Sequence, residues 1–290
     1  MTEDLGRLIS KIRTSGPSNN IDSQNITCFL TSKKKSKSFI FRNKYKFLQT
    51  TDRILESSCY HIDGIICNLC RYNDELKLPH FPEIVFANNE LKIQSTKDEK
   101  LFLSFNALDA MKMINTSENP EFKVSMSDEW IASREQYLNL KPSSHSFDWS
   151  FTTRYKGTIG EGVIVKDTTE EIDIEKLKRR DPIIEFDNFA LYEDELHDNG
   201  LSKLEIKYRV MDECFLLLQR FFLRVDGVIF RVIDTRIYHD ATKNYLLREW
   251  TYREQHVRDM NEATLENIKN EEYLATHLPL LDRTMEKLLL

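Results

Sequence analysis

The run Phe215–His239 constrains this fold more than any other part of the chain, because it is the densest apolar stretch and is interrupted by a single turn signal, Asp226-Gly227. Asp-Gly between two apolar runs predicts a β-hairpin with a two-residue turn, since both turn residues must accept positive φ. A buried helix over Met211–Leu223 is the alternative, but the β-branched run after the turn favours strands. The two-residue turn sets three opposing pairs on one face, which we expect to be core: Val225 with Val228, Leu223 with Phe230, and Phe221 with Val232.

The second face of this hairpin mixes cationic and apolar side chains. On the predicted register it carries Arg220, Phe222, Arg224, Ile229, Arg231 and Ile233. Because an unpaired buried charge is costly, this face is not expected to lie deep in the core. Two interpretations stay open: a solvated face with incidental isoleucines, or a surface for a protein partner, where arginine and large apolar residues are enriched.

Further strands are predicted on both sides of the hairpin, joined by short turns. Leu204–Val210 alternates apolar and charged residues with a period of two, which is typical of a half-buried strand, and Asn199-Gly200 predicts a turn before it. Tyr245–Tyr252 adds a strand after the hairpin. Short connections favour antiparallel pairing, because parallel strands need crossovers. The predicted class is α+β, with a dominant, sandwich-like antiparallel sheet and a few short peripheral helices, one of them capped by Asn106.

Composition divides the chain into three parts. Residues 1–50 hold ten Lys or Arg against three Asp or Glu and few apolar positions, so we expect a mostly flexible basic segment with one short strand near its end. Within it, Lys33–Lys37 fits either a solvated disordered tail or a nuclear-localisation patch. Residues 51–260 are expected to form one α+β domain, and residues 261–290 a peripheral helical tail.

Composition also excludes several classes of function. The net charge of −6 argues against a general nucleic-acid binder. No apolar run reaches the ~20 residues of a membrane span, and the N-terminus lacks a secretory apolar region. The five cysteines suit a reducing compartment better than a disulfide framework. A phosphate-binding glycine loop, a nucleophile elbow and a His-Glu-x-x-His motif are all missing from the sequence, so we expect no cofactor and no catalytic residue.

One short segment raises the question of a metal. Cys59, His61, Cys67, Cys70 and His80 lie close together in sequence, and the Cys-x-x-Cys at its centre has the spacing of a zinc ligand pair. A second close pair is missing. We therefore interpret the cysteines as ordinary residues of a partly apolar segment and predict no metal, with a zinc site as the alternative.

The acidic turn at residues 193–198 raises the same question. It gathers four carboxylates around His197, but it lacks the glycine and the terminal glutamate of an EF-hand loop. We interpret it as the solvated end of a hairpin. A charge patch for a basic partner and the metal site of a metal-dependent enzyme are the alternatives.

Five segments resemble the TIPRL (TOR signalling pathway regulator-like) family, in the family's order, across about residues 80–255. They are FNALDA at 105–110, DWSFTTRYKGT at 148–158, EDELHDNG at 193–200, RFFLRVDG at 220–227 and DTRIY at 234–238. The resemblance implies a non-catalytic regulatory protein that binds the catalytic subunits of type 2A protein phosphatases and modulates their activity in TOR signalling. It also implies association with the alpha-four/Tap class of phosphatase-binding proteins, and a cytoplasmic location that in some members is also nuclear. A metal-dependent enzyme and a general scaffold are the alternatives.

The resemblance carries over five partner-contact positions: Asp109, Ile172, Val232, Asp234 and Trp250. Many family members have methionine where Val232 stands and tyrosine where Trp250 stands. We expect exposed side chains at this site, with Asp234 and Trp250 close together, because a large residue with one donor is a common interface anchor. Ile172 is expected to be exposed in its polar stretch. Two features point the other way: Asp109 suits the first turn of a helix, and the predicted hairpin register puts Val232 on the core face.

Overall fold

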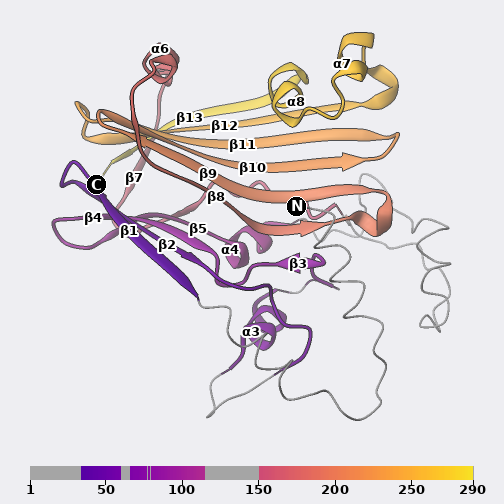
Figure 1. The fold of residues 1–290 in the computed structure, drawn as a ribbon, viewed down its shortest axis with the longest axis horizontal. Coiled ribbons are helices and arrows are strands. Elements are labelled where there is room, and N and C mark those ends of the chain that lie inside the picture. The colour runs from indigo at the N-terminus through magenta and orange to yellow at the C-terminus, as the bar shows by residue number, and fades with distance from the viewer. Residues whose placement is uncertain (1–33, 60–65, 77, 79, 115–149, 290) are drawn as a thin grey trace. The chain divides into compact units, whose positions relative to one another are not determined.

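The computed structural model describes residues 34–59, 66–76, 78, 80–114 and 150–289, which form two antiparallel β-sheets (Figure 1). The five-stranded sheet runs β1 (Lys35–Phe41), β2 (Tyr45–Thr51), β4 (Glu90–Ser95), β5 (Leu101–Asn106) and β6 (Thr158–Ile159). The eight-stranded sheet runs β3 (Ile84–Val85), β8 (Ile183–Asp194), β9 (Gly200–Met211), β10 (Cys214–Val225), β11 (Ile229–Asp240), β12 (Tyr245–His256), β13 (Leu280–Leu289) and β7 (Ile164–Asp167). The predicted α+β class with a dominant antiparallel arrangement is confirmed.

The described helices are short. They are α3 (Asn68–Glu75), α4 (Ala107–Met111), α6 (Ile174–Lys178), α7 (Glu262–Glu266) and α8 (Glu271–His277), with 3-10 turns η1 (Leu196–Asp198) and η2 (Val257–Asp259). The predicted cap of α4 is confirmed, since the Asn106 side chain accepts a hydrogen bond of 2.8 Å from the backbone N–H of Asp109. None of the described helices is long and apolar enough to span a membrane.

The two sheets pack face to face, and the side chains between them form the main core. The Phe215 ring of β10 meets three rings of β1 and β2 edge-on, with centroids 5.3 Å from Phe41, 5.9 Å from Tyr45 and 5.0 Å from Phe47. In the same layer, the Tyr208 hydroxyl of β9 donates to the Gln49 side chain of β2 at 2.5 Å. We call this side of the eight-stranded sheet its inner face and the opposite side its outer face.

The predicted register of the central hairpin is wrong by one residue. Val225 pairs with Ile229 rather than Val228, so the loop has three residues, with φ of +69° at Gly227. Phe221, Leu223 and Val225 do face the core, as predicted. On the second strand, however, the faces are exchanged, because a shift of one residue turns every side chain over. Val232 therefore lies on the outer face, which removes the conflict between its predicted core position and its place among the partner-contact residues.

The expectation that the arginines of the hairpin stay out of the interior is wrong for Arg220 and Arg231, whereas the side chain of Arg224 is 40% exposed. Arg220 on the outer face and Arg231 on the inner face are each 2% exposed. Burial is tolerated because each guanidinium has an acidic partner: Arg220 pairs with Asp234 at 2.8 Å, and Arg231 pairs with Glu254 at 2.5 Å. Both faces of the central strands thus contain buried charged side chains.

The expected limits of the domain need correction at both ends. Residues 35–50, assigned to the flexible basic segment with one short strand, form β1 and all of β2 but its last residue, and they contribute Phe41, Tyr45 and Phe47 to the core. At the other end, residues 261–290 are not entirely helical: α7 and α8 are followed by β13, which pairs with both β12 and β7. Residues 1–33, including Lys33 of the basic run, lie outside the described part.

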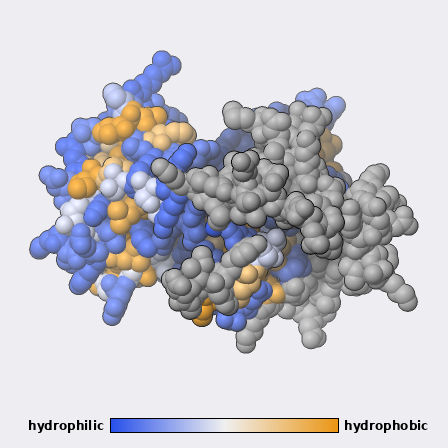
Figure 2. Space-filling model, turned by 60° about the horizontal axis from the view of Figure 1, so that its bottom comes forward, coloured by the Kyte–Doolittle hydropathy of each residue, from blue (hydrophilic) through white to orange (hydrophobic). Residues whose placement is uncertain are grey.

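On the side of the molecule shown in Figure 2, apolar and hydrophilic side chains are interspersed over the coloured part of the surface. Three large apolar residues that are exposed, Ile183, Ile184 and Phe186, are nevertheless neighbours at the start of β8. Scattered apolar residues are normal on a protein surface, and a run of three on one strand is short of a large patch.

Gly200 offers a test of the strand packing. It opens β9 and pairs with Val225 of β10, and a Cβ atom there would lie 1.9 Å from the carbonyl oxygen of Arg224. We expect Gly200→Ala to lower the free energy of unfolding by about 1–3 kcal/mol, because the strands must separate to admit the methyl group. The measurement is denaturant unfolding, with Val228→Ala in the exposed part of the neighbouring hairpin loop as the control. An unchanged midpoint for Gly200→Ala would contradict this packing.

Candidate functional site

A buried ion pair lies at the centre of the outer face. Asp234 of β11 sits directly opposite Arg220 of β10, and its two carboxylate oxygens accept hydrogen bonds of 2.8 Å from Nε and Nη2 of the guanidinium. Burial alone would lower the pKa of Arg220, but the hydrogen bonds and charge of Asp234 outweigh it and hold that pKa above its usual value. Bidentate pairing of this kind is strong and geometrically specific.

Ion pairs continue from this pair across five strands. Toward β13, Arg236 lies 3.5 Å from Asp234 and 3.0 Å from Glu249, and Arg283 lies 2.7 Å from Glu249. Toward β9, Glu272 of α8 lies 3.0 Å from Arg220. We call the set the charged belt; its members are Lys203, Glu205, Lys207, Arg220, Asp234, Arg236, Glu249, Glu272 and Arg283. Cross-strand opposite charges stabilise a sheet and fix how its side chains lie.

Two apolar clusters flank the charged belt on the outer face. At the hairpin end, Val232 packs with Phe222 and Phe230 against Leu274 and Ala275 of α8. At the other end, Ile172 packs with Tyr238, Leu247 and Cys214. Figure 1 shows α8 and α6 over the same sheet at opposite ends of its strands. The predicted exposure of Ile172 is wrong, because it is 7% exposed and belongs to this second cluster.

Trp250 lies on the other side of the sheet. Its indole is 2% exposed and belongs to the core between the sheets, stacked on Tyr252 with centroids 6.4 Å apart. The ammonium of Lys156 lies 4.6 Å from the indole centroid, and the guanidinium of Arg154 lies 5.8 Å from it. A cation over an aromatic face is attractive, so both basic side chains are held at this edge of the sandwich.

Asp109 lies in the first turn of α4, near the edge strand β6. Its Oδ2 accepts hydrogen bonds from the Thr158 hydroxyl at 2.6 Å and from the Asn106 side chain at 2.9 Å. The Tyr155 hydroxyl is 2.8 Å from the same Thr158 hydroxyl. Asp109 therefore ties α4 to β6, and part of its side chain reaches solvent.

The structure does not bring the five predicted residues into one exposed patch. Asp234 is 1% exposed and Trp250 is 2% exposed, and they occupy opposite faces of the eight-stranded sheet. The expectation that these two lie together and reach solvent is wrong. What the belt does expose are neighbours that sequence reasoning passed over: the side chain of Arg236 is 30% exposed, that of Arg283 37% and that of Glu272 67%. Two features of the sequence point toward this surface: the alternating charges of β9, which also fit a half-buried strand, and the arginines of the β10–β11 hairpin.

The interpretation of the acidic turn as a solvated hairpin end is wrong for one of its four carboxylates. Asp194 is buried, and its carboxylate accepts hydrogen bonds from the backbone N–H groups of Glu83 at 2.9 Å and Leu196 at 2.7 Å. Burial raises the pKa of Asp194 to about 7. The carboxylate thus joins the turn to β3 through backbone groups. Among the described residues, the group whose ligand atoms lie close enough together to hold a metal ion is Cys59, Cys67 and Cys70, away from this turn.

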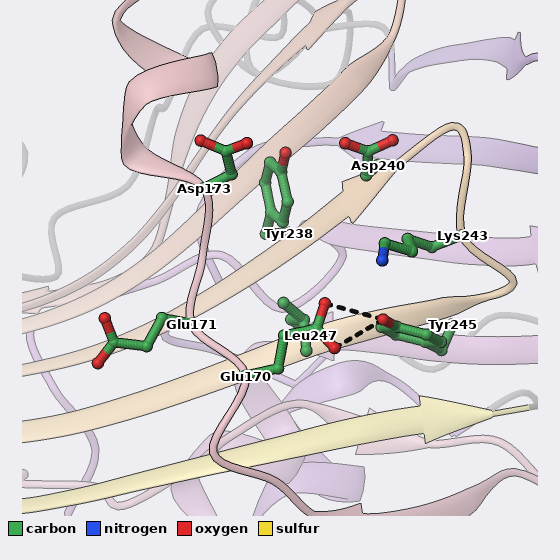
Figure 3. Close-up of a pocket in the computed structure, with 8 residues that line it drawn as sticks. All are labelled: Glu170, Glu171, Asp173, Tyr238, Asp240, Lys243, Tyr245 and Leu247. Carbon is green, nitrogen blue, oxygen red and sulfur yellow. Dashed lines mark hydrogen bonds between the residues drawn. The ribbon is translucent and has the colours of Figure 1, made fainter.

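A small acidic pocket of about 170 Å³ lies beside Ile172, between the segment before α6 and the end of the β11–β12 hairpin (Figure 3). The Tyr245 hydroxyl is 2.8 and 2.7 Å from the two carboxylate oxygens of Glu170. At the opposite wall, the Asp240 carboxylate pairs with the Lys176 ammonium at 2.8 Å. Burial alone would raise the pKa of Asp240, but the hydrogen bond and charge of Lys176 outweigh burial and lower that pKa to about 2. These acids are engaged in stabilising contacts, which favours a structural role for the pocket.

The chain is similar in sequence to proteins of one family. The sequence model of the TIP41-like family matches residues 84–261 of this chain. A "TIP41-like protein" of Caenorhabditis elegans is 39% identical over 247 residues, which cover 84% of this chain and 87% of that protein. One of Homo sapiens is 42% identical over 219 residues, covering 74% and 79%. The "Type 2A phosphatase activator TIP41" of Saccharomyces cerevisiae is 37% identical over 193 residues, covering 61% and 54%.

Removing one partner of the central ion pair should destabilise the fold strongly. We expect Asp234→Ala to lower the free energy of unfolding by about 3–5 kcal/mol, because Arg220 is left buried without its bidentate partner. The double variant Arg220→Met with Asp234→Leu should recover most of that loss, since apolar residues of similar volume replace a buried pair well. Urea unfolding of both variants tests this, and a double variant less stable than Asp234→Ala would contradict the account.

Acid should weaken the fold through His239. Burial lowers the pKa of this ring from 6.5 to about 4, among Phe41, Tyr45 and Phe215. Between pH 6.5 and 4 the unfolded chain binds a proton at this histidine and the folded chain does not. The stability that the neutral His239 ring contributes is therefore complete above pH 6.5 and is lost as the pH falls toward 4. The loss is on the order of 3 kcal/mol by pH 4. Urea unfolding at pH 4.5 and 7 should show a smaller difference in His239→Phe than in the wild type.

Proposed function

The chain belongs to the TIP41-like family, and from that premise we propose that it is a non-catalytic regulatory protein that binds the catalytic subunits of type 2A protein phosphatases and modulates their activity in TOR signalling. The observation that carries the proposal is the family match over residues 84–261, because relatives in two yeasts are named type 2A phosphatase activators. Association with an alpha-four/Tap protein and a cytoplasmic and nuclear location belong to the same proposal, and their support is the family resemblance.

The five positions Asp109, Ile172, Val232, Asp234 and Trp250 are proposed as the residues that shape the phosphatase contact. All but Asp109 are buried, so they act by positioning exposed neighbours rather than by touching the partner. Asp234 supports this most directly, because it holds Arg220 in place and lies 3.5 Å from Arg236, which reaches solvent. Val232 does the same for the α8 end of the charged belt through its packing on Leu274.

Direct contact is assigned to the exposed members of the charged belt, with Arg236 and Arg283 first among them. Both guanidinium groups converge on Glu249, which fixes their positions before a partner arrives. Arginine is enriched at protein interfaces, and a preorganised side chain loses less freedom on binding. Because cations and anions alternate along the belt, it is suited to select a partner with the complementary pattern rather than any charged surface.

A substitution of the exposed belt tests the proposal without breaking the core. Arg236→Gln with Arg283→Gln removes both charges, while the amides can still donate hydrogen bonds to Glu249. We expect binding to a purified type 2A catalytic subunit to weaken about tenfold, as measured by surface plasmon resonance. The matched control is Arg42→Gln with Lys46→Gln, which removes two cations from the β1–β2 hairpin and should bind as the wild type does.

Failure of the proposed function and failure of the proposed contact surface give different results. If the wild-type chain does not bind a type 2A catalytic subunit, the proposed function is wrong. If it binds, but the belt variant binds equally well and the circular dichroism of both proteins is the same, the function stands and the contact surface is wrong. Asp234→Ala and Trp250→Ala are poorer tests, because their burial makes loss of binding hard to separate from loss of fold.

A further inference from the structure

Three cysteine thiols converge beside α3, in a region with no part in the charged belt. The Sγ atoms of Cys59 and Cys70 are 3.3 Å apart, and those of Cys67 and Cys59 are 3.6 Å apart. All three sulfur atoms lie within 4.8 Å of one another. Cys59 follows β2 in the chain, and Cys67 and Cys70 belong to the start of α3, so two separate pieces of chain supply the cluster.

Local structure explains the pair on the helix. Cys67 is the N-cap residue of α3, in extended conformation, and Cys70 follows three residues later within the first turn. Residues three apart on a helix lie on the same side, so both thiols point to one spot.

The spacing of the sulfur atoms suits a tetrahedral metal rather than a disulfide. A zinc–sulfur bond of about 2.3 Å in a tetrahedron places two sulfur ligands about 3.8 Å apart. The separations of 3.3 and 3.6 Å are shorter than that value by about 0.5 and 0.2 Å. A disulfide needs about 2.05 Å, so the thiols are not at bonding distance.

The cluster contains the three cysteines, but not His80, of the Cys/His segment that the sequence analysis singled out. His80 is not part of it, because its ring packs edge-on against Phe151 at 5.2 Å and its Nδ1 lies 3.1 Å from the carbonyl oxygen of Phe81. His61 lies outside the described residues. In the described part of the chain, three thiols and no fourth His, Cys, Asp or Glu form the group. Cys59 is exposed, so water or a small solute can reach the remaining coordination position.

We propose that Cys59, Cys67 and Cys70 bind one thiophilic metal ion, Zn²⁺ in the first place, as three thiolates with the fourth position left to an exogenous ligand. Each thiol gives up its proton to solvent as its sulfur binds the ion, so loading releases up to three protons and involves no change in oxidation state. The bound ion ties α3 to the chain that follows β2, which adds a link between α3 and the five-stranded sheet. The site is independent of the proposed phosphatase contact.

The test uses the full chain, reduced, stripped with a chelator and titrated anaerobically with Co²⁺. We expect one equivalent to bind, with thiolate-to-cobalt charge-transfer absorption and the visible bands of a tetrahedral ion, and one equivalent of Zn²⁺ to abolish both. Cys59→Ser, Cys67→Ser and Cys70→Ser should each weaken binding at least about tenfold, since even the loss of a group that merely supports a ligand costs that much. Cys214→Ala, which removes a buried thiol of the Ile172 cluster, is the matched control and should bind as the wild type does.

Three results would overturn the proposal. One is the absence of charge-transfer absorption in a wild-type protein whose circular dichroism shows it folded. Another is cobalt binding that survives serine at all three positions. The last is a wild-type mass two hydrogens lower after mild oxidation, with a disulfide between Cys59 and Cys70, combined with no metal uptake by the reduced form. Because Cys59 is exposed, Cys59→Ser is expected to fold, and its thermal unfolding without metal should match that of the wild type.

Discussion

The buried pair of Arg220 and Asp234 is the interaction on which the outer face of this protein depends. It exists because the hairpin loop has three residues rather than two, which sets Arg220 directly opposite Asp234. With a two-residue turn, Asp234 would face the five-stranded sheet and Arg220 would be opposite an isoleucine. A charge buried to this degree persists only with excellent geometry, and the bidentate pair with Glu272 at its edge supplies it.

Around this pair, the eight-stranded sheet is covered on both sides by different means. Its inner face packs on the five-stranded sheet through aromatic rings, and its outer face is closed at the two ends of the strands by α8 and by the segment that carries Ile172 and α6. The charged belt lies between these two covers. Ion pairs there are mutually neutralising, so the belt is better suited to recognising a partner than to activating a nucleophile or a water. That agrees with a regulatory role in a family whose yeast members are named phosphatase activators.

The cysteine cluster stands apart from the belt in both position and chemistry. Thiolates that share one ion would link the chain after β2 to the start of α3. Asn68 of α3 donates a hydrogen bond of 3.0 Å to the side chain of Asn88 in the turn before β4, and Asn88 donates one of 3.0 Å to Asp52 at the end of β2. A metal would thus reinforce a connection that hydrogen bonds already make, and it would do so without touching the surface proposed for the phosphatase.

The sequence by itself determined the fold class, the strands with clean alternation, the Asn106 cap of α4 and the family, because each depends on local pattern or on motifs of neighbouring residues. Tertiary structure decided the rest. The loop length at Asp226–Val228 set which face each side chain of β11 takes, and acidic partners on neighbouring strands made the burial of Arg220 and Arg231 tolerable. Leu280–Leu289 became a strand because β12 and β7 offered edges on either side of it. In each case the deciding contact is with a residue on another strand. The free energy of such cross-strand contacts cannot be inferred from the local sequence pattern of one strand.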